Sequence, residues 1–110
     1  MANINVTATK LNQNEVGEID FKAATSSDTI IFDYDGAGDN KLCMIFKGAG
    51  TVTVNKGDAI QGVVDLTGTV TTEGALWVDS GMFKNVTGTN KGKVTATVSA
   101  NTSVALIQLP

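Results

Sequence analysis

The chain has 110 residues, with 8 basic and 11 acidic side chains, no histidine and a formal net charge of −3. Its hydrophobic content of 42% is too high for a disordered chain, and its charged content of 17% is low for a soluble domain. The basic residues are all lysine. Nucleic-acid binding usually requires a basic face with arginine, so we expect no nucleic-acid partner.

Short strands, in which apolar and polar residues alternate, are predicted from the N-terminus onward. The first places Ile4, Val6 and Ala8 on one face, with polar residues between them. Residues 18–21 bring Ile19 and Phe21 together in the same way, and the Ser- and Thr-rich stretch that begins at Phe21 could form one helical turn. Residues 28–34 then carry a short apolar run, Ile30, Ile31 and Phe32, with a β-branched bias that is typical of a strand.

The middle of the chain predicts a hairpin. Residues 41–47 and 51–54 read as strands, and the glycine-bearing segment 48–50 between them has a common hairpin loop length. Cys43 lies among hydrophobic neighbours in the first strand, which predicts a small buried residue. A nucleophilic role for Cys43 would require a nearby base, and the chain has no histidine.

The last third of the chain reads as strands up to its final residues. Val94, Ala96 and Val98 alternate with polar residues such as Thr95, so we expect the valines at 52, 54, 94 and 98 to face the core and Thr95 to face water. Turn signals recur about every 8–12 residues, which is typical of a sandwich or barrel. We therefore expect residues 1–110 to form one all-β domain, a small antiparallel β-sandwich of immunoglobulin-like or jelly-roll-like type.

Residues with the chemistry of a catalytic or metal site are few. Asp33, Asp35 and Asp39 could offer oxygen ligands to Ca²⁺, but their spacing does not match an EF-hand loop, and aspartate and glycine are typical of turns. We interpret this loop as a turn and expect no metal and no cofactor. With no histidine and with scattered carboxylates, we also expect that the protein is not an enzyme.

Residues 74–110 resemble a family of small virion proteins of tailed phages, the head decoration proteins. The likeness is carried by an aliphatic strand, a small-residue bend and an aromatic (ALWVDSGMFKN), then a polar glycine turn, then two valine-rich strands ending in an aliphatic tail. The upstream segment KLCMIFKGAGTVTVNKGD is similar to the strand, glycine turn and Val-Thr strand of the same family. At the bend, this chain has Asp-Ser-Gly where the family pattern would have glycine and proline.

The resemblance implies a β-sandwich that binds the major capsid protein on the outer surface of an assembled phage head. The protein would then be made in the bacterial cytoplasm and located on the virion, and the N-terminus has neither the basic start nor the apolar core of a secretory signal. No apolar run approaches the length of a membrane helix, so we expect no membrane partner.

The final strand suggests a docking surface. Ala105, Ile107 and Leu109 alternate with residues that are themselves largely apolar, so both faces of the strand are hydrophobic. An apolar outer face must be covered by a loop of the same chain, a neighbouring subunit or the capsid. We take Ala105, Ile107, Leu109 and Trp77 as candidate interface residues. We expect a homotrimer, because closed symmetry covers such a surface without open-ended growth, and a monomer is the alternative.

Two other functions remain open. The first is a different virion structural protein, such as a subunit of the tail or of a head fibre. A tail-tube or connector subunit would need a long β-hairpin arm, and no such arm is evident from the sequence. A carbohydrate-binding or adhesion sandwich is the other, and it would present exposed aromatic residues on one sheet face. Aromatic residues are only 5% of the chain. Trp77 and Tyr34 are the candidates for such a platform, although a lone tryptophan in a strand more often lies in a core or an interface.

Overall fold

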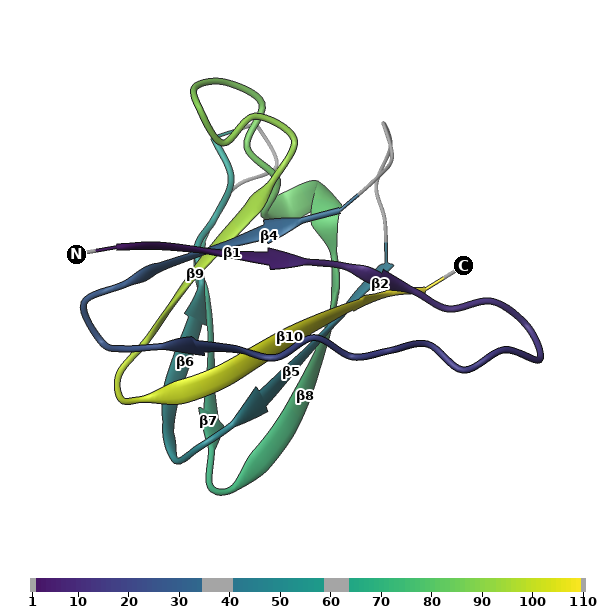
Figure 1. The fold of residues 1–110 in the computed structure, drawn as a ribbon. Helices are drawn as coiled ribbons and strands as arrows, with labels where there is room; N and C mark the ends of the chain where they lie inside the picture. The colour runs from purple at the N-terminus through teal and green to yellow at the C-terminus, as the bar shows by residue number, and fades with distance from the viewer. Residues whose placement is uncertain (1, 35–40, 59–63, 110) are drawn as a thin grey trace.

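The computed structural model describes residues 2–34, 41–58 and 64–109, which are built almost entirely from β-strands (Figure 1). The all-β fold is confirmed. Within the described residues, no helix is long and apolar enough to cross a membrane. The elements in chain order are β1 (Asn3–Thr7), β2 (Thr9–Lys10), β3 (Lys22–Ala24), β4 (Thr29–Asp33), β5 (Lys41–Lys47), β6 (Gly50–Val54), β7 (Leu66–Val70), β8 (Glu73–Asp79), the 3₁₀ turn η1 (Ser80–Met82), β9 (Val94–Val98) and β10 (Thr102–Gln108).

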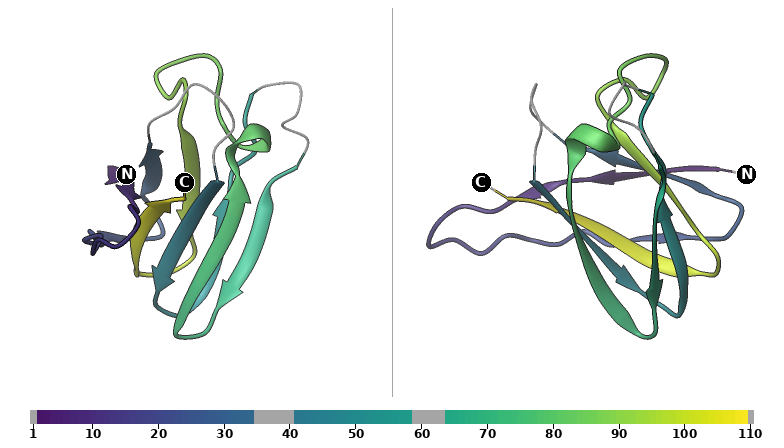
Figure 2. Two further views of the ribbon diagram at one scale, coloured as in Figure 1. Left: turned by 90° about the vertical axis from the view of Figure 1, so that its right-hand side faces the viewer. Right: turned by 180° about the vertical axis from the view of Figure 1, so that it is seen from behind.

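The strands form two sheets that pack into a β-sandwich, as expected (Figures 1 and 2). Sheet A has the order β1-β4-β9-β6-β7, and sheet B has the order β2-β10-β5-β8, with β3 also paired to β10. Neighbouring strands are antiparallel except that β1 runs parallel to β4 and β2 runs parallel to β10. The parallel pairs arise because the N-terminal segment runs along sheet A and then, past Ala8, joins sheet B. The N–H of Ala8 donates to the carbonyl of Asp33 over 2.8 Å at this crossing.

The predicted hairpin at residues 48–50 is wrong. β5 pairs with β8 and β10 in sheet B, whereas β6 pairs with β7 and β9 in sheet A, so the glycine segment carries the chain from one sheet to the other. The β3–β4, β7–β8 and β9–β10 connections cross between the sheets in the same way (Figure 1). Sequence shows where a turn lies, but pairing across the turn depends on which strands cover each other's apolar faces.

The core lies between the two sheets, where alternate residues of each strand point inward. Val52, Val54, Val94 and Val98 are all buried, which confirms their predicted orientation. The largest fully buried side chains around them come from both sheets: Ile30, Phe32, Leu42, Met44, Phe46, Val104 and Leu106. The expectation for Thr95 is wrong, because this outer-face residue is only 8% exposed and its hydroxyl accepts a hydrogen bond of 3.1 Å from the side-chain amide of Asn55.

Cys43 and the segment around Phe21 also differ from the sequence-based expectations. Cys43 is half-buried on the outer face of sheet B rather than in the core, because the core face of β5 is taken by the residues on either side of it. Residues 18–21 form no strand, and Ile19 is 42% exposed. No helical turn follows Phe21: β3 is followed by a loop in which the N–H of Thr25 donates to the carboxylate of Asp28 over 2.8 Å.

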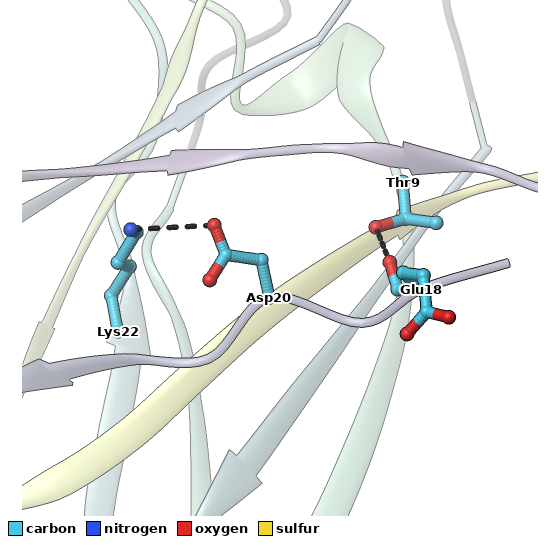
Figure 3. Close-up of polar contacts among 4 residues, drawn as sticks. All are labelled: Thr9, Glu18, Asp20 and Lys22. Carbon is cyan, nitrogen blue, oxygen red and sulfur yellow. Dashed lines mark hydrogen bonds and ion pairs between the residues drawn. The ribbon is translucent and has the colours of Figure 1, made fainter.

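Residues 11–21 project beyond the sandwich as two legs without strand hydrogen bonding (Figures 1 and 2). Two polar contacts lie at the base of this segment, as Figure 3 shows: the hydroxyl of Thr9 donates to the carbonyl of Glu18 over 2.5 Å, and Lys22 Nζ lies 3.3 Å from Asp20 Oδ2. This projecting segment forms no strands, and it is an arm that the sequence pattern did not predict.

Candidate docking surface

The outer face of sheet B carries an apolar band that crosses its three long strands. Strand register places Ile107 of β10 opposite Cys43 of β5, and Cys43 opposite Trp77 of β8. The next row on the same face joins Ala105, Ile45 and Ala75. Because side chains alternate between faces of a sheet, these residues point away from the core that their neighbours fill. We call these six residues the apolar band.

Exposure varies along the apolar band. Trp77 is 64% exposed, whereas Ile107, Cys43 and Ile45 are half-buried. The tryptophan stands out because β8 is the edge strand of sheet B and has a neighbour on one side only. The ammonium of Lys41 lies 6.0 Å from the centroid of the Trp77 ring, at the outer limit of a cation–π contact. Trp77 is therefore a surface residue, as an interface or ligand-binding role would require, and not part of the core.

The chain itself covers the other end of the band. Ala105 is 0% exposed although it points away from the core. The register of β3 places Lys22 beside Val104, so the preceding residue, Phe21, lies next to Ala105. The Phe21 ring lies on this face, with its centroid 4.2 Å from the ammonium of Lys47. Of the candidate interface residues, Ala105 is thus already covered by its own chain.

Charged residues border the apolar band at both ends. On the same face, Lys47 lies opposite Glu73, and Lys41 lies opposite Asp79. Cross-strand pairs of opposite charge support the register of the sheet. Leu109 lies just beyond β10, half-buried, and its N–H donates to the carbonyl of Lys41 over 3.0 Å. An apolar centre with a polar rim is the usual anatomy of a protein–protein interface.

The structure connects candidate residues that the sequence left separate. Trp77 and Ile107 are far apart in the chain, and Cys43 lies between them in the register. Sequence reasoning missed Cys43 and Ile45 as members of this surface. The sequence did contain a sign of it: β5 is apolar on both faces, because Cys43 and Ile45 are apolar like the core-facing residues that alternate with them.

The structure describes only the start of the acidic loop. Asp35 and Asp39 lie outside the described residues, and Asp33 ends β4, where its Oδ2 lies 3.9 Å from Lys93 Nζ. No group of three or more histidine, cysteine, aspartate or glutamate side chains is placed to hold a metal ion within residues 2–34, 41–58 and 64–109.

The band presents hydrocarbon, one indole ring and one thiol, which suits contact with a complementary apolar surface. Its rim offers lysine and carboxylate side chains that can fix the orientation of a partner. Comparison of the chain with protein-family models, curated proteins and solved structures finds no match.

Proposed function

We propose that this protein is a structural component of a tailed-phage virion, a decoration protein that binds the major capsid protein on the outer surface of the assembled head through the apolar band. The observation that carries the proposal is the row formed by Ile107, Cys43 and the largely exposed Trp77 on the outer face of one sheet. In an isolated sandwich, that face would alternate to polar residues. The resemblance of residues 74–110 to head decoration proteins supports the same role.

Such a role requires a rigid surface and no reaction chemistry. A protein that binds the assembled shell and not its separate subunits stabilises the shell by mass action. Many copies, each making a modest contact, together resist expansion of the head. We also propose that the protein acts as a homotrimer, a symmetry that matches three-fold positions on an icosahedral shell.

Binding to phage heads that lack the protein tests the proposal. Cys43 offers a probe that needs no mutation, because it is the chain's one cysteine and lies in the middle of the band. Its reaction with a thiol reagent should slow when heads are added and remain unchanged with bovine serum albumin. Unchanged labelling on heads that visibly bind the protein would exclude the band as the contact.

Variants locate the contact independently. Ile107→Asp and Trp77→Asp each place a charge in the band and should abolish saturable binding to the heads. Thr67→Asp is the matched control, since Thr67 is exposed on β7 in the other sheet and should bind as the wild type does. Circular dichroism checks that each variant is folded. Retained binding by folded Ile107→Asp and Trp77→Asp would overturn the proposal.

A second candidate role is that of another virion structural protein, a subunit of the tail or of a head fibre. The projecting arm of residues 11–21 favours it, because subunits that build tubes or rings commonly reach across to their neighbours. Electron microscopy of the purified protein separates the two roles: a tail or fibre subunit is expected to form long assemblies without heads.

A third role, carbohydrate binding, is favoured by the exposed indole of Trp77. Quenching or enhancement of Trp77 fluorescence by bacterial surface polysaccharide would support it. The chain has no other tryptophan to mask the signal.

A further inference from the structure

β8 is the edge strand of sheet B, and two hydrogen bonds at the ends of β5 show which way its backbone groups point. The N–H of Gly48 donates to the carbonyl of Thr72 over 2.7 Å, and the N–H of Leu109 donates to the carbonyl of Lys41 over 3.0 Å. The first bond continues the register of β5 with β8, and the second continues the register of β5 with β10. Opposed residues of an antiparallel pair alternate between bonded and non-bonded positions, so each bond fixes the alternation along its pair of strands.

This alternation assigns the backbone groups of β8. Gly74, Leu76 and Val78 follow Thr72 at even spacing, so their N–H and C=O groups bond to β5. The N–H and C=O groups of Ala75 and Trp77 therefore point to the other side, where no further strand of the described chain lies. Ala75 and Trp77 are both exposed. β8 thus offers donors and acceptors to another extended backbone.

The free edge of β8 lacks the usual protection. Edge strands are commonly guarded by lysine or proline, by a bulge or by being very short. β8 is seven residues long, keeps a continuous register with β5 and contains neither lysine nor proline. Its charged residues, Glu73 and Asp79, lie only at its two ends. The middle of the edge is therefore open to a further strand.

Space for the side chains of such a strand lies between β8 and β7, the edge strand of the other sheet (Figure 2). A first hollow, of about 440 Å³, is lined mainly by Leu66, Val78, Met82 and Phe83. A second hollow, of about 160 Å³, lies between Gly68 of β7 and Gly74 of β8. It exists because these two residues have no side chains: a Cβ on Gly68 would have only Val52 Cγ2 near it, at 3.9 Å.

The two hollows match the spacing of a β-strand. Successive side chains of a strand point to opposite faces, so every second residue of an added strand would face the space between the sheets. The residue opposite Val78 would enter the first hollow, and the residue opposite Gly74 would enter the second. Both belong to the inward-facing set of one strand. The hollows are therefore the places for two apolar side chains of a strand that the described chain does not supply.

The ends of β8 indicate what kind of segment fits. If β8 paired antiparallel over its full length with β8 of a second copy, Glu73 would lie opposite Asp79, and like charges directly opposite each other are destabilising. β5, which pairs with the other side of β8, places Lys41 opposite Asp79 and Lys47 opposite Glu73, with apolar residues between. A segment with the pattern of β5 therefore fits the free edge better than a second β8 does.

We propose that β8 binds an extended segment of another protein, which joins sheet B as an antiparallel strand with basic residues at both ends and apolar residues facing the sandwich. The backbone of Ala75 and Trp77 bonds to this segment, and two of its apolar side chains fill the hollows. Addition of a strand to an exposed sheet edge is a general mode of peptide recognition. The inference goes beyond the proposed head binding, which uses outer-face side chains of the apolar band.

The heptapeptide Lys-Leu-Thr-Met-Thr-Phe-Lys is the probe. It keeps the lysines and core-facing residues of β5 and replaces the two outward residues by threonine. Titration into the full chain should change the fluorescence of Trp77, the one tryptophan, to a saturating value. The control peptide Glu-Leu-Thr-Met-Thr-Phe-Glu should bind about tenfold more weakly, because its ends repel Glu73 and Asp79.

N-methylated peptides and hydrogen exchange test the assigned backbone groups. The two threonines of the peptide lie opposite Trp77 and Ala75, so methylation of their nitrogens should abolish binding, whereas methylation at leucine and methionine should preserve it. The amide hydrogens of Ala75 and Trp77 should exchange quickly in the protein alone and slowly with the peptide. Those of Leu76 and Val78 should exchange slowly in both.

Two protein variants locate the contact. Gly68→Leu fills the second hollow and should prevent peptide binding, whereas Thr67→Leu, its exposed neighbour on the outer face of β7, should bind as the wild type does. Ala75→Pro removes an N–H that points to the free edge, so this variant should fold and lose binding. Leu76→Pro removes an N–H bonded to β5 and should unfold the protein. Circular dichroism checks the fold of each variant.

The inference is overturned if the peptide does not bind, if Ala75 and Trp77 are already protected from exchange without it, or if folded Gly68→Leu and Ala75→Pro bind it as the wild type does. Light scattering covers the other occupant: a wild-type oligomer that Ala75→Pro dissociates would place a second copy on this edge and also overturn the inference. Head binding is scored separately. Heads that bind a protein unable to bind the peptide contradict only this inference, and a protein that binds the peptide but no heads contradicts only the decoration role.

Discussion

The N–H of Thr51 donates a hydrogen bond of 2.8 Å to the side-chain oxygen of Ser99, and the N–H of Ser99 donates to the carbonyl of Thr51 over 2.9 Å. This reciprocal pair joins the start of β6 to the crossing between β9 and β10. A bond of 2.7 Å from the N–H of Gly48 to the carbonyl of Thr72 joins the β5–β6 crossing to the β7–β8 crossing. These hydrogen bonds thus link the three crossings. They pair backbone N–H and C=O groups that would pair between the two strands if each crossing were a hairpin.

Removal of the Ser99 hydroxyl should weaken this link. Ser99→Ala leaves the N–H of Thr51 without its side-chain acceptor, and we expect a loss of about 1 kcal/mol in the free energy of unfolding. Urea denaturation measures the loss. Ser26→Ala, in the exposed β3–β4 loop, is the matched control and should change stability little. Equal effects of the two substitutions would mean that the Ser99 bond does not hold the crossings together.

Val94→Ala should be more costly than substitutions on the other face of β9. Val94 is fully buried, so loss of its methyl groups should cost about 1–3 kcal/mol through reduced burial and a residual cavity. Thr95→Ala should cost about 1 kcal/mol, because it removes the hydrogen bond from Asn55. Thr97 is half-buried, so Thr97→Ala should lower the free energy of unfolding least of the three substitutions. Midpoints of chemical denaturation give the order, and a Thr97→Ala variant as unstable as Val94→Ala would contradict it.

Gly57 and Gly68 should respond oppositely to alanine. A Cβ on Gly57 would lie 2.8 Å from the carbonyl carbon of Lys84 and 2.9 Å from that of Phe83, both of them backbone atoms. We expect Gly57→Ala to cost about 1–3 kcal/mol, as overpacking does. On Gly68 the nearest atom would be Val52 Cγ2 at 3.9 Å, so Gly68→Ala should be neutral or stabilising by up to about 1 kcal/mol. Thermal melts that lower both midpoints equally would refute the steric argument.

Stability should fall in acid because of two hydrogen-bonded carboxylates. The hydroxyl of Thr87 and the N–H of Val86 donate to Asp58 and hold the pKa of this carboxyl below its ordinary value of 3.8. The N–H of Thr25 lowers the pKa of Asp28 in the same way. A pKa that is lower in the folded state contributes stability that is present above pH 3.8 and is lost as the pH falls through the lowered value.

Urea unfolding between about pH 6 and about pH 2.5 measures this dependence. Asp58→Ala should lower stability at neutral pH and flatten the acid slope, whereas a slope identical to that of the wild type would show that Asp58 does not contribute to it.

The acidic loop from Asp33 to Asp39 should hold no tightly bound metal ion. Thermal melts in EDTA and in millimolar Ca²⁺ should then have the same midpoint within a degree or two. A rise of several degrees with Ca²⁺, the effect of saturating a site present only in the folded state, would contradict this prediction.

Local pattern determined much of this fold. Alternation of apolar and polar residues predicted that Val52, Val54, Val94 and Val98 face the core, because side chains on successive residues of a strand point to opposite faces. The same reasoning identified a C-terminal strand with two apolar faces. Composition and turn spacing were sufficient for the all-β class, since both are summed over the whole chain and do not depend on which strands pair.

Only the tertiary structure decided which strands pair with one another, and that pairing decided which residues form the apolar band. The turn at residues 48–50 was visible in the sequence, but a crossing and a hairpin use similar glycines and differ only in the partners that their strands meet. Cys43 was misassigned for the same reason: in a strand with two apolar faces, the face toward the core depends on the opposing sheet. Trp77, Cys43 and Ile107 became one surface only through the register of β8, β5 and β10, which is fixed by long-range contacts that no local pattern encodes.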